Sequence, residues 1–195
     1  GRAALFVQDV WRVPGVSGLS VVPGARLELD SWYGFVPTPK LALRWQAAPS
    51  LTVRVSAGTG YRAPSFKELL LRFENPGAGY VVQGTPTLRP ETSRSLQLGA
   101  EWAASDTLWL SANVFHNDLS DLITITTLKA ASAGQPAQYG YTNVASAWTA
   151  GLELAAQSQP APWLDLKLSY TLTESRDQSL QQPLEGRARH RGTAQ

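Results

Sequence analysis

The chain has 195 residues, of which 43% are apolar and only 16% are charged, against about 25% charged in ordinary soluble domains. No apolar run approaches the roughly 18 residues that a membrane helix needs. The net charge is +2, its basic residues are scattered, and there is no cysteine. These totals exclude a helical membrane protein and a disulfide-stabilised secreted domain, and they argue against nucleic acid as a partner.

Alternation of apolar and polar residues dominates the chain. In the segment 164–172 a leucine or tyrosine takes every second position, and 41–47, 53–57, 96–102 and 148–156 repeat the pattern. In a β-strand this period of two gives the sheet one apolar and one polar face. About nine strands are predicted, near 4–13, 19–30, 40–47, 51–61, 93–103, 108–127, 139–157, 163–174 and from 188.

The connections between these segments alternate between short and long. Short turns are predicted at 14–18, 48–50, 104–107 and 158–162, and long loops at 31–39, 62–92, 128–138 and 175–187. This alternation is typical of an antiparallel, up-and-down transmembrane β-barrel, with short periplasmic turns at one end and long extracellular loops at the other. The apolar face would meet outer-membrane lipid and the polar face a wet lumen. A soluble β-sandwich that acts as a binding module remains the all-β alternative.

Motifs for catalysis are weak. Gly58-Thr59-Gly60 lacks the third glycine and the following helix pattern of a phosphate-binding loop. The serines have no histidine in a recognisable motif, so no nucleophile–base pair can be assigned. We therefore predict a protein that is not an enzyme, with no catalytic residue, no metal ligand and no cofactor.

The stretch from Gly58 to Trp102 resembles the barrel of TonB-dependent outer-membrane receptors. In that family an Arg-Ala-Pro element opens an extracellular loop, here Tyr61-Arg62-Ala63-Pro64, and Ser65 could cap a short helix over 66–71. A second element closes the loop, here Thr85-Pro86-Thr87-Leu88 followed by Pro90-Glu91-Thr92. Segments 115–123 and 141–154 resemble the next hairpin, and 6–13 and 21–34 the preceding strands, so the resemblance spans nearly the whole chain.

The resemblance implies a receptor in a Gram-negative-type outer membrane that takes up a bulky nutrient when the TonB complex pulls on an internal plug. Family barrels have twenty-two strands around such a plug. We find no plug-like segment, and nine strands cannot close that barrel. Residues 1–195 are therefore interpreted as a partial receptor β-barrel from its later part, with the plug domain and the closing strands absent. A passive, porin-like channel is the alternative within the membrane class.

The long loop at 62–92 supplies the predicted ligand site. Cations beside aromatic rings suit an anionic ferric siderophore, and the resemblance also leaves cobalamin or another bulky solute open. No histidine lies between Tyr61 and Leu88, which disfavours haem unless Tyr80 or a residue outside these 195 supplies the iron ligand. The alternative is that Arg62 and Glu68 only brace the loop. The predicted ligand-binding residues are Arg62, Phe66, Lys67, Arg72, Phe73 and Tyr80.

Charged residues also occur in the polar register of the strands, where they would face the lumen. In a receptor such a mixed-charge wall would form hydrogen bonds with the plug, and in an open porin it would tune ion selectivity. The predicted lumen-facing or plug-facing residues are Arg44, Arg54, Glu101, Glu153 and Lys167.

Overall fold

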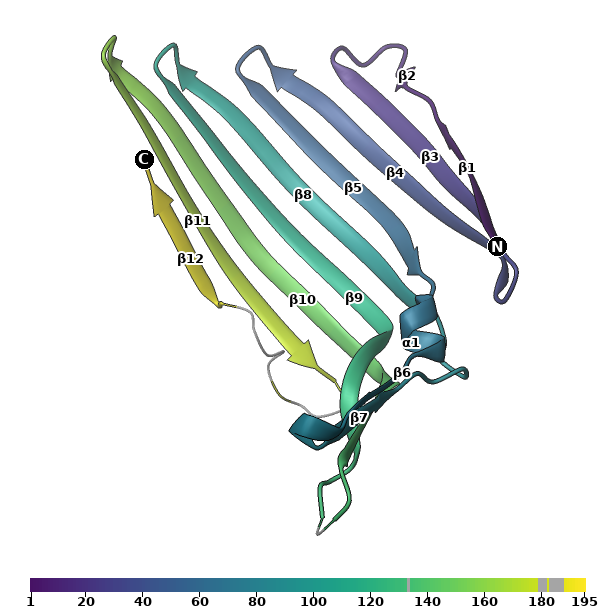
Figure 1. Ribbon diagram of the computed structural model, residues 1–195. Helices are drawn as coiled ribbons and strands as arrows, with labels where there is room; N and C mark the ends of the chain where they lie inside the picture. The colour runs from purple at the N-terminus through teal and green to yellow at the C-terminus, as the bar shows by residue number, and fades with distance from the viewer. Residues whose placement is uncertain (133, 179–181, 183–187) are drawn as a thin grey trace.

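The computed structural model describes residues 1–132, 134–178, 182 and 188–195, and its strands form one sheet (Figure 1). Nine strands follow one another in the order β1-β3-β4-β5-β8-β9-β10-β11-β12, and every pair along this path is antiparallel. This confirms the predicted up-and-down arrangement. The strands are β1 Arg2–Gln8, β2 Trp11–Arg12, β3 Leu19–Asp30, β4 Gly34–Ala48, β5 Leu51–Arg62, β8 Glu91–Ser105, β9 Leu108–Lys129, β10 Ala137–Ala161, β11 Leu164–Asp177 and β12 His190–Ala194.

The first predicted strand, 4–13, is divided into β1 and β2, which both pair with β3. Asp9 lies at the break, where its carboxylate accepts hydrogen bonds from the Val10 backbone N–H and from the Trp11 indole, each at 2.7 Å. A side chain that satisfies local donors in this way competes with the ladder and interrupts it.

The short connections gather at one end of the sheet, at the top of Figure 1, and the loop that carries α1 and β6–β7 lies at the other. The predicted long loop at 31–39 is wrong, because β4 already begins at Gly34. The Asp30 carboxylate closes this turn by accepting hydrogen bonds from the N–H groups of Trp32 and Tyr33, at 2.7 and 3.2 Å. The predicted loop at 175–187 falls mostly outside the described residues.

The first residues of β4 include two prolines, Pro37 and Pro39. Both positions pair with β3, yet the β4–β5 ladder begins only at Lys40, opposite Gly58. The Gln46 N–H donates toward β3, to the Gly18 carbonyl, so by alternation even-numbered positions of β4 bond to β3 and odd-numbered ones face β5. The two prolines therefore occupy positions where no β5 partner is bonded, as expected for a residue without an N–H.

The register places the predicted apolar and polar residues on opposite faces. One row of directly opposed residues crosses five strands and is wholly apolar: Val55, Leu98, Val114, Leu152 and Leu172. On β9, Val114 is 53% exposed in the chain, whereas Asn113 and Asn117 on the polar face are partly buried. The apolar face is the outward one, and exposed apolar area of this extent marks a surface that another phase must cover.

Few residues of the chain are fully buried, and they gather where the long loop meets the sheet. The buried apolar residues are Ala63, Pro64, Leu69, Leu88 and Ala147. The core therefore lies at the loop end of the sheet. Neither helix of the described residues, α1 Phe66–Leu70 or the 3-10 turn Pro76–Ala78, is long and apolar enough to cross a membrane.

Candidate functional site

The predicted extracellular loop, here residues 63–90, begins with a capped helix. Pro64 is fully buried after the end of β5, and Ser65 then caps α1. The Ser65 hydroxyl accepts a hydrogen bond from the Glu68 N–H at 3.2 Å, and the Glu68 carboxylate accepts one from the Ser65 N–H at 2.7 Å. This reciprocal capping box satisfies two backbone donors that would otherwise lack partners. The predicted helix and its cap are confirmed.

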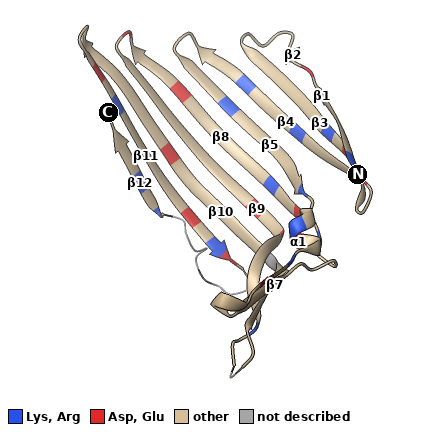
Figure 2. Ribbon diagram, viewed as in Figure 1, with Lys and Arg blue, Asp and Glu red and all other residues tan. Residues whose placement is uncertain are grey.

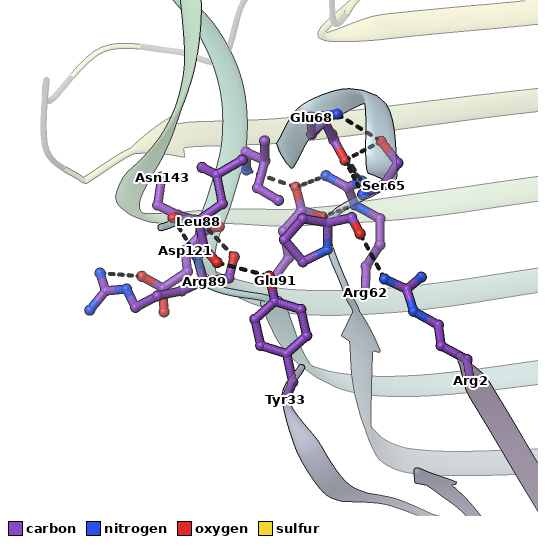
Figure 3. Close-up of polar contacts among 12 residues, drawn as sticks. Arg2, Tyr33, Arg62, Ser65, Glu68, Leu88, Arg89, Glu91, Asp121 and Asn143 are labelled. Atoms are coloured by element: carbon purple, nitrogen blue, oxygen red, sulfur yellow. Dashed lines mark hydrogen bonds and ion pairs between the residues drawn. The ribbon is translucent and has the colours of Figure 1, made fainter. Parts of the chain in front are cut away.

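Arg62 joins the two ends of the loop (Figure 3). It is the last residue of β5 and lies opposite Glu91, the first residue of β8. Its Nε and Nη2 donate to the two Glu91 carboxylate oxygens at 2.6 and 2.5 Å, and its Nη1 donates to Glu68 at 3.1 Å. Glu91 also accepts from the Ile123 N–H at 2.8 Å. Arg62 therefore links Glu68 at the start of the loop to Glu91 at its end, and we call this link the brace. Because its N–H groups already bond to these two carboxylates, the guanidinium has little donor capacity left for a ligand.

The same contacts determine the charge on Glu68. Burial opposes its ionisation, but hydrogen bonds from the Ser65 N–H and hydroxyl and from Arg62 outweigh burial and lower the pKa of the Glu68 carboxyl below its ordinary value. Glu68 is therefore ionised at neutral pH. Its carboxylate joins the N-terminus of α1 at Ser65 to the Arg62 guanidinium.

A second cluster fixes the closing end of the loop. Asn143 on β10 accepts a hydrogen bond from the Arg89 N–H at 2.8 Å and donates to the carbonyls of Arg89 and Asp121, at 2.9 and 2.6 Å. The Arg89 side chain forms an ion pair with the Asp121 carboxylate at 2.6 Å. Asp121 has a positive φ of 57°, so it interrupts the strand conformation where this cluster forms.

Two further side chains reach the loop from the first strands. The Tyr33 hydroxyl donates to the Leu88 carbonyl at 3.0 Å, and the Arg2 Nη2 donates to the Pro64 carbonyl at 2.7 Å (Figure 3). Arg2 also bonds to the buried Asp30 carboxylate through its Nε at 2.5 Å. Sequence reasoning missed these contacts and Asn143, because each joins segments that are far apart along the chain.

The middle of the loop is a hairpin that adds to the sheet. β6 Arg72–Asn75 pairs with β7 Tyr80–Gln83, and β7 pairs in parallel with the outer end of β10, with Tyr80 opposite Ala137 and Gln83 opposite Gly140. The tight turn between them uses Gly79 in the left-handed region, at φ 67°. The loop is thus built as an extension of the barrel wall.

The structure divides the six predicted ligand residues into three groups. Arg62 is the brace, and Phe66 and Lys67 lie on α1, where Phe66 borders a small pocket with Trp32. Arg72, Phe73 and Tyr80 lie together on the β6–β7 hairpin.

An aromatic cluster forms on this hairpin. The rings of Phe73 and Tyr80 have centroids 6.1 Å apart, and Tyr80 meets Tyr139 of β10 edge-on at 6.2 Å. Arg72 is next to this cluster, largely exposed, and forms a weak surface pair with Glu74 at 3.2 Å. Phe73 is 45% exposed, so a ring face stays open to a solute. Tyr139 was not among the predicted ligand residues. Its contact with Tyr80 depends on the pairing of β7 with β10, which the sequence did not indicate.

The five predicted lumen-facing residues share one face of the sheet. Arg44 lies opposite Arg54, and the register carries the same face through Gly99 and Asn113 to Glu153. Glu101 lies on this face because it is two residues from Gly99 on β8. Lys167 lies on it because it pairs with Gln157, which is four residues from Glu153 on β10.

This polar face encloses a hollow of about 890 Å³ lined by four of the five, all except Lys167. Arg54 forms an ion pair with Glu101, and the Asn113 amide donates to Glu153 at 2.9 Å. Figure 2 shows the charges along the sheet: cations on β3, β4 and β5 stand beside anions on β8 and β10. Contact of this wall with a plug stays a prediction.

Comparison with known proteins identifies the chain's relatives. A family model described as "TonB dependent receptor-like, beta-barrel" matches residues 1–195. The iron-regulated outer membrane virulence protein of Vibrio cholerae is 32% identical over 89% of this chain and 27% of its own length. The heme/hemopexin utilization protein C of Haemophilus influenzae is 29% identical over 72% of this chain and 22% of its own. The crystal structure of a ferric enterobactin receptor mutant from Pseudomonas aeruginosa superimposes with a TM-score of 0.78 at 24% identity, over 99% of this chain and 29% of that one.

The chain belongs to the TonB-dependent receptor β-barrel family and is an outer-membrane protein. This confirms the resemblance, the transmembrane barrel architecture and the predicted location, and the family is one of receptors. The chain spans about a quarter of the length of the curated relatives it matches. A further apolar hollow of about 980 Å³ lies on the outward face, lined by residues such as Leu110, Leu154 and Leu168.

Proposed function

We propose that the chain forms part of the barrel of a receptor for active uptake of a ferric siderophore or a similarly bulky nutrient, powered by the TonB complex through a plug. The observation that carries this proposal is the 63–90 loop. It is braced at both ends, joined to the sheet through β10, and carries the Phe73–Tyr80 ring pair and the exposed Arg72. A loop held so firmly serves recognition better than it serves passive conduction.

The chemistry of the hairpin supports a siderophore more than haem. A flat aromatic face stacks on a catechol or similar ring, and an exposed guanidinium such as that of Arg72, which is held only by a surface pair with Glu74, pairs with the ligand's negative charge. The name of the Haemophilus influenzae relative refers to haem, but here no histidine lies between Tyr61 and Leu88 to serve as an axial iron ligand.

Growth of a deletion strain carrying the whole gene tests the proposal. We expect the gene to restore growth on one ferric siderophore as the iron source, and only when TonB is present. Phe73→Ala and Tyr80→Ala should each weaken uptake by roughly 5- to 100-fold, since base–aromatic and ring stacking contributes about 1–3 kcal/mol. Phe35→Ala, another exposed phenylalanine but on β4, is the matched control.

Two outcomes would contradict the proposal. Growth restored equally without TonB would favour the passive channel, since conduction needs no energy from the inner membrane. Unchanged growth on every iron and cobalamin source after deletion would remove the proposed substrate class.

A further inference from the structure

A row of inward-facing arginines crosses the first strands of the sheet close to the short turns. The register sets Arg12 of β2 opposite Ser20 of β3, Ser20 opposite Arg44 of β4, and Arg44 opposite Arg54 of β5. Like charges directly opposite one another on neighbouring strands destabilise a sheet. Arg54 has an anion beside it, because it forms an ion pair with Glu101. Folding alone therefore gives no reason for the charge of Arg44.

Three cations of this wall have no partner in the part of the chain that the structure describes. The side chains of Lys40, Arg44 and Arg12 form no hydrogen bond and no ion pair there, and all three residues are exposed. We call these three residues the inner cations. Three unpaired cations on one wall of a lumen make a surface that attracts anions.

The carboxylates of the same hollow are already engaged. Glu101 forms the ion pair with Arg54, and Glu153 accepts a hydrogen bond from the Asn113 amide at 2.9 Å. Both carboxylates line the hollow of about 890 Å³ on the inward face, together with two of the inner cations. The free charge on this side of the hollow is therefore positive, and the anion that matches it comes from outside the described residues.

The inner cations follow the barrel axis toward the short turns, and Figure 2 shows the cations of β4 spread along that strand. Arg44 lies four residues nearer the turn at 49–50 than Lys40 does. Four residues span roughly 13 Å along a strand, which a tilt of about 40° reduces to roughly 10 Å along the membrane normal. Arg12 lies at the level of Arg44, two strand spacings or roughly 10 Å away. The two long side chains are close enough to reach one anion over Ser20.

An exposed aromatic ring lies at the loop end of the same wall. Phe6 of β1 pairs with Arg26 of β3, which places it on the inward face, where it lines the hollow with two of the inner cations. Phe6 is 65% exposed, so packing within the chain does not account for an aromatic ring in the polar register. An open ring followed by free cations suits a solute that has both an aromatic ring and negative charge, as the β6–β7 hairpin does.

We propose that the solute leaves the barrel along this wall. An anionic, ring-bearing ferric complex passes from Phe6 and Lys40 to an anion site formed by Arg12 and Arg44 near the turn end. This inference rests on the proposed function and adds a second site, on the inward face, to the one on the hairpin. A carboxylate of the plug would also satisfy the arginines, but it would use neither the open ring nor a further free cation nearer the loop. The observations therefore favour the solute.

Separate measurements of binding and uptake by cells that carry the whole receptor test the proposal. The probe is the radioiron complex of a tris-catecholate siderophore. Surface binding is measured in a strain without TonB, and the initial uptake rate in a strain with TonB. A passage lined by one sign of charge raises rates by about tenfold or more, so Arg12→Gln with Arg44→Gln should lower the uptake rate roughly tenfold and leave the surface affinity unchanged. Arg12→Lys with Arg44→Lys should keep most of the rate.

The matched control removes the same charge from the outward face. It is Arg94→Gln with Arg176→Gln, and both of these arginines lie in the apolar register of their strands. Its uptake rate and surface affinity should equal those of the parent. Heat-modifiable electrophoretic mobility checks that each variant barrel is folded, and Arg44→Gln against Arg44→Lys replaces the double variants if the double glutamine variant is not.

An unchanged uptake rate in the double glutamine variant, or the same loss in the outward control, would overturn the proposal. A surface affinity that falls in parallel with uptake would also overturn it, because the arginines would then act at the first site. If they hold the plug instead, the glutamine variant would admit vancomycin to cells without TonB, and that result counts against the solute. A parent receptor that neither binds nor takes up the probe would refute the route for an anionic complex, whereas TonB-dependent growth on another iron source would leave the proposed function standing.

Discussion

Removal of the Arg62 guanidinium should release the extracellular loop from the barrel rim. In Arg62→Met the side chain keeps most of its apolar stem but loses four hydrogen bonds to carboxylates, two to Glu91 and two to Glu68. It also leaves two negative charges near one another without a cation between them.

The size of the effect follows from the exposure of the partners. A hydrogen bond to a charged group contributes about 1.5–3 kcal/mol when buried. The Arg62 side chain is 46% exposed and the two carboxylates are largely covered, at 14% and 16%, so solvent screens part of each interaction. We therefore expect the free energy of loop opening to fall by about 2 kcal/mol in total, while the barrel itself stays folded.

Hydrogen–deuterium exchange of the whole receptor in detergent measures this directly. A change of about 2 kcal/mol makes amides within 63–90 exchange roughly 30-fold faster, with β8 and β9 below the brace little changed. The matched control is Arg72→Met, which removes an exposed pair with Glu74 and should change exchange less than twofold. Equal exchange in Arg62→Met and the parent, or an equal effect of Arg72→Met, would refute the role of the brace.

Three other predictions concern pH, the lipid face and one strand contact. Because the pKa of Glu68 is lowered in the folded loop, its contribution to loop stability is complete above the ordinary value of 4.5 and is lost as the pH falls below it. The protection factors within 63–90, which are corrected for the intrinsic pH dependence of amide exchange, should therefore fall as the pH drops below about 4.5 and stay constant above. Leu152→Arg, in the wholly apolar row, should cost roughly 2–4 kcal/mol of folding into lipid vesicles by the whole barrel, whereas Lys167→Leu should be much milder; equal costs would contradict the assigned faces. Gly151→Ala should impair barrel assembly, seen as lost heat-modifiable mobility, because the new methyl would lie 2.3 Å from the Leu172 carbonyl oxygen. Gly99→Ala, whose nearest contact is an Asn113 side-chain oxygen at 3.4 Å, should assemble normally, and similar behaviour of the two variants would refute the steric argument.

Strand positions and faces could be predicted because the signal for them is local. Residues 164–172 alternate without exception, and the structure gives one continuous strand, Leu164–Asp177. The helix after Pro64 was equally accessible, since a serine followed three residues later by a glutamate is a complete capping signal within one turn. In both cases the residues that decide the structure are neighbours in the chain.

The parts of the fold that the sequence concealed depend on distant partners. Residues 72–83 have no strand periodicity of their own, and β7 exists because β10 extends far enough to pair with it. Asn143 lies 54 residues from Arg89, with which it exchanges hydrogen bonds, and nothing in the surrounding segment signals that contact. The predicted loop at 31–39 was wrong where β4 runs through Pro37 and Pro39, whose missing N–H groups are tolerated on the side that faces no bonded partner.

The parallel pairing of β7 with β10 limits how far the 63–90 loop can move. A loop that closes over a solute needs a hinge, but this hairpin pairs with the sheet, with positions 80–83 bonded to positions 137–140. Closing it would break that ladder, so the aromatic face around Tyr80 is preorganised. For the proposed solute, recognition at this hairpin would then depend on shape complementarity to a preformed surface, and little of the binding energy would be spent on ordering the protein.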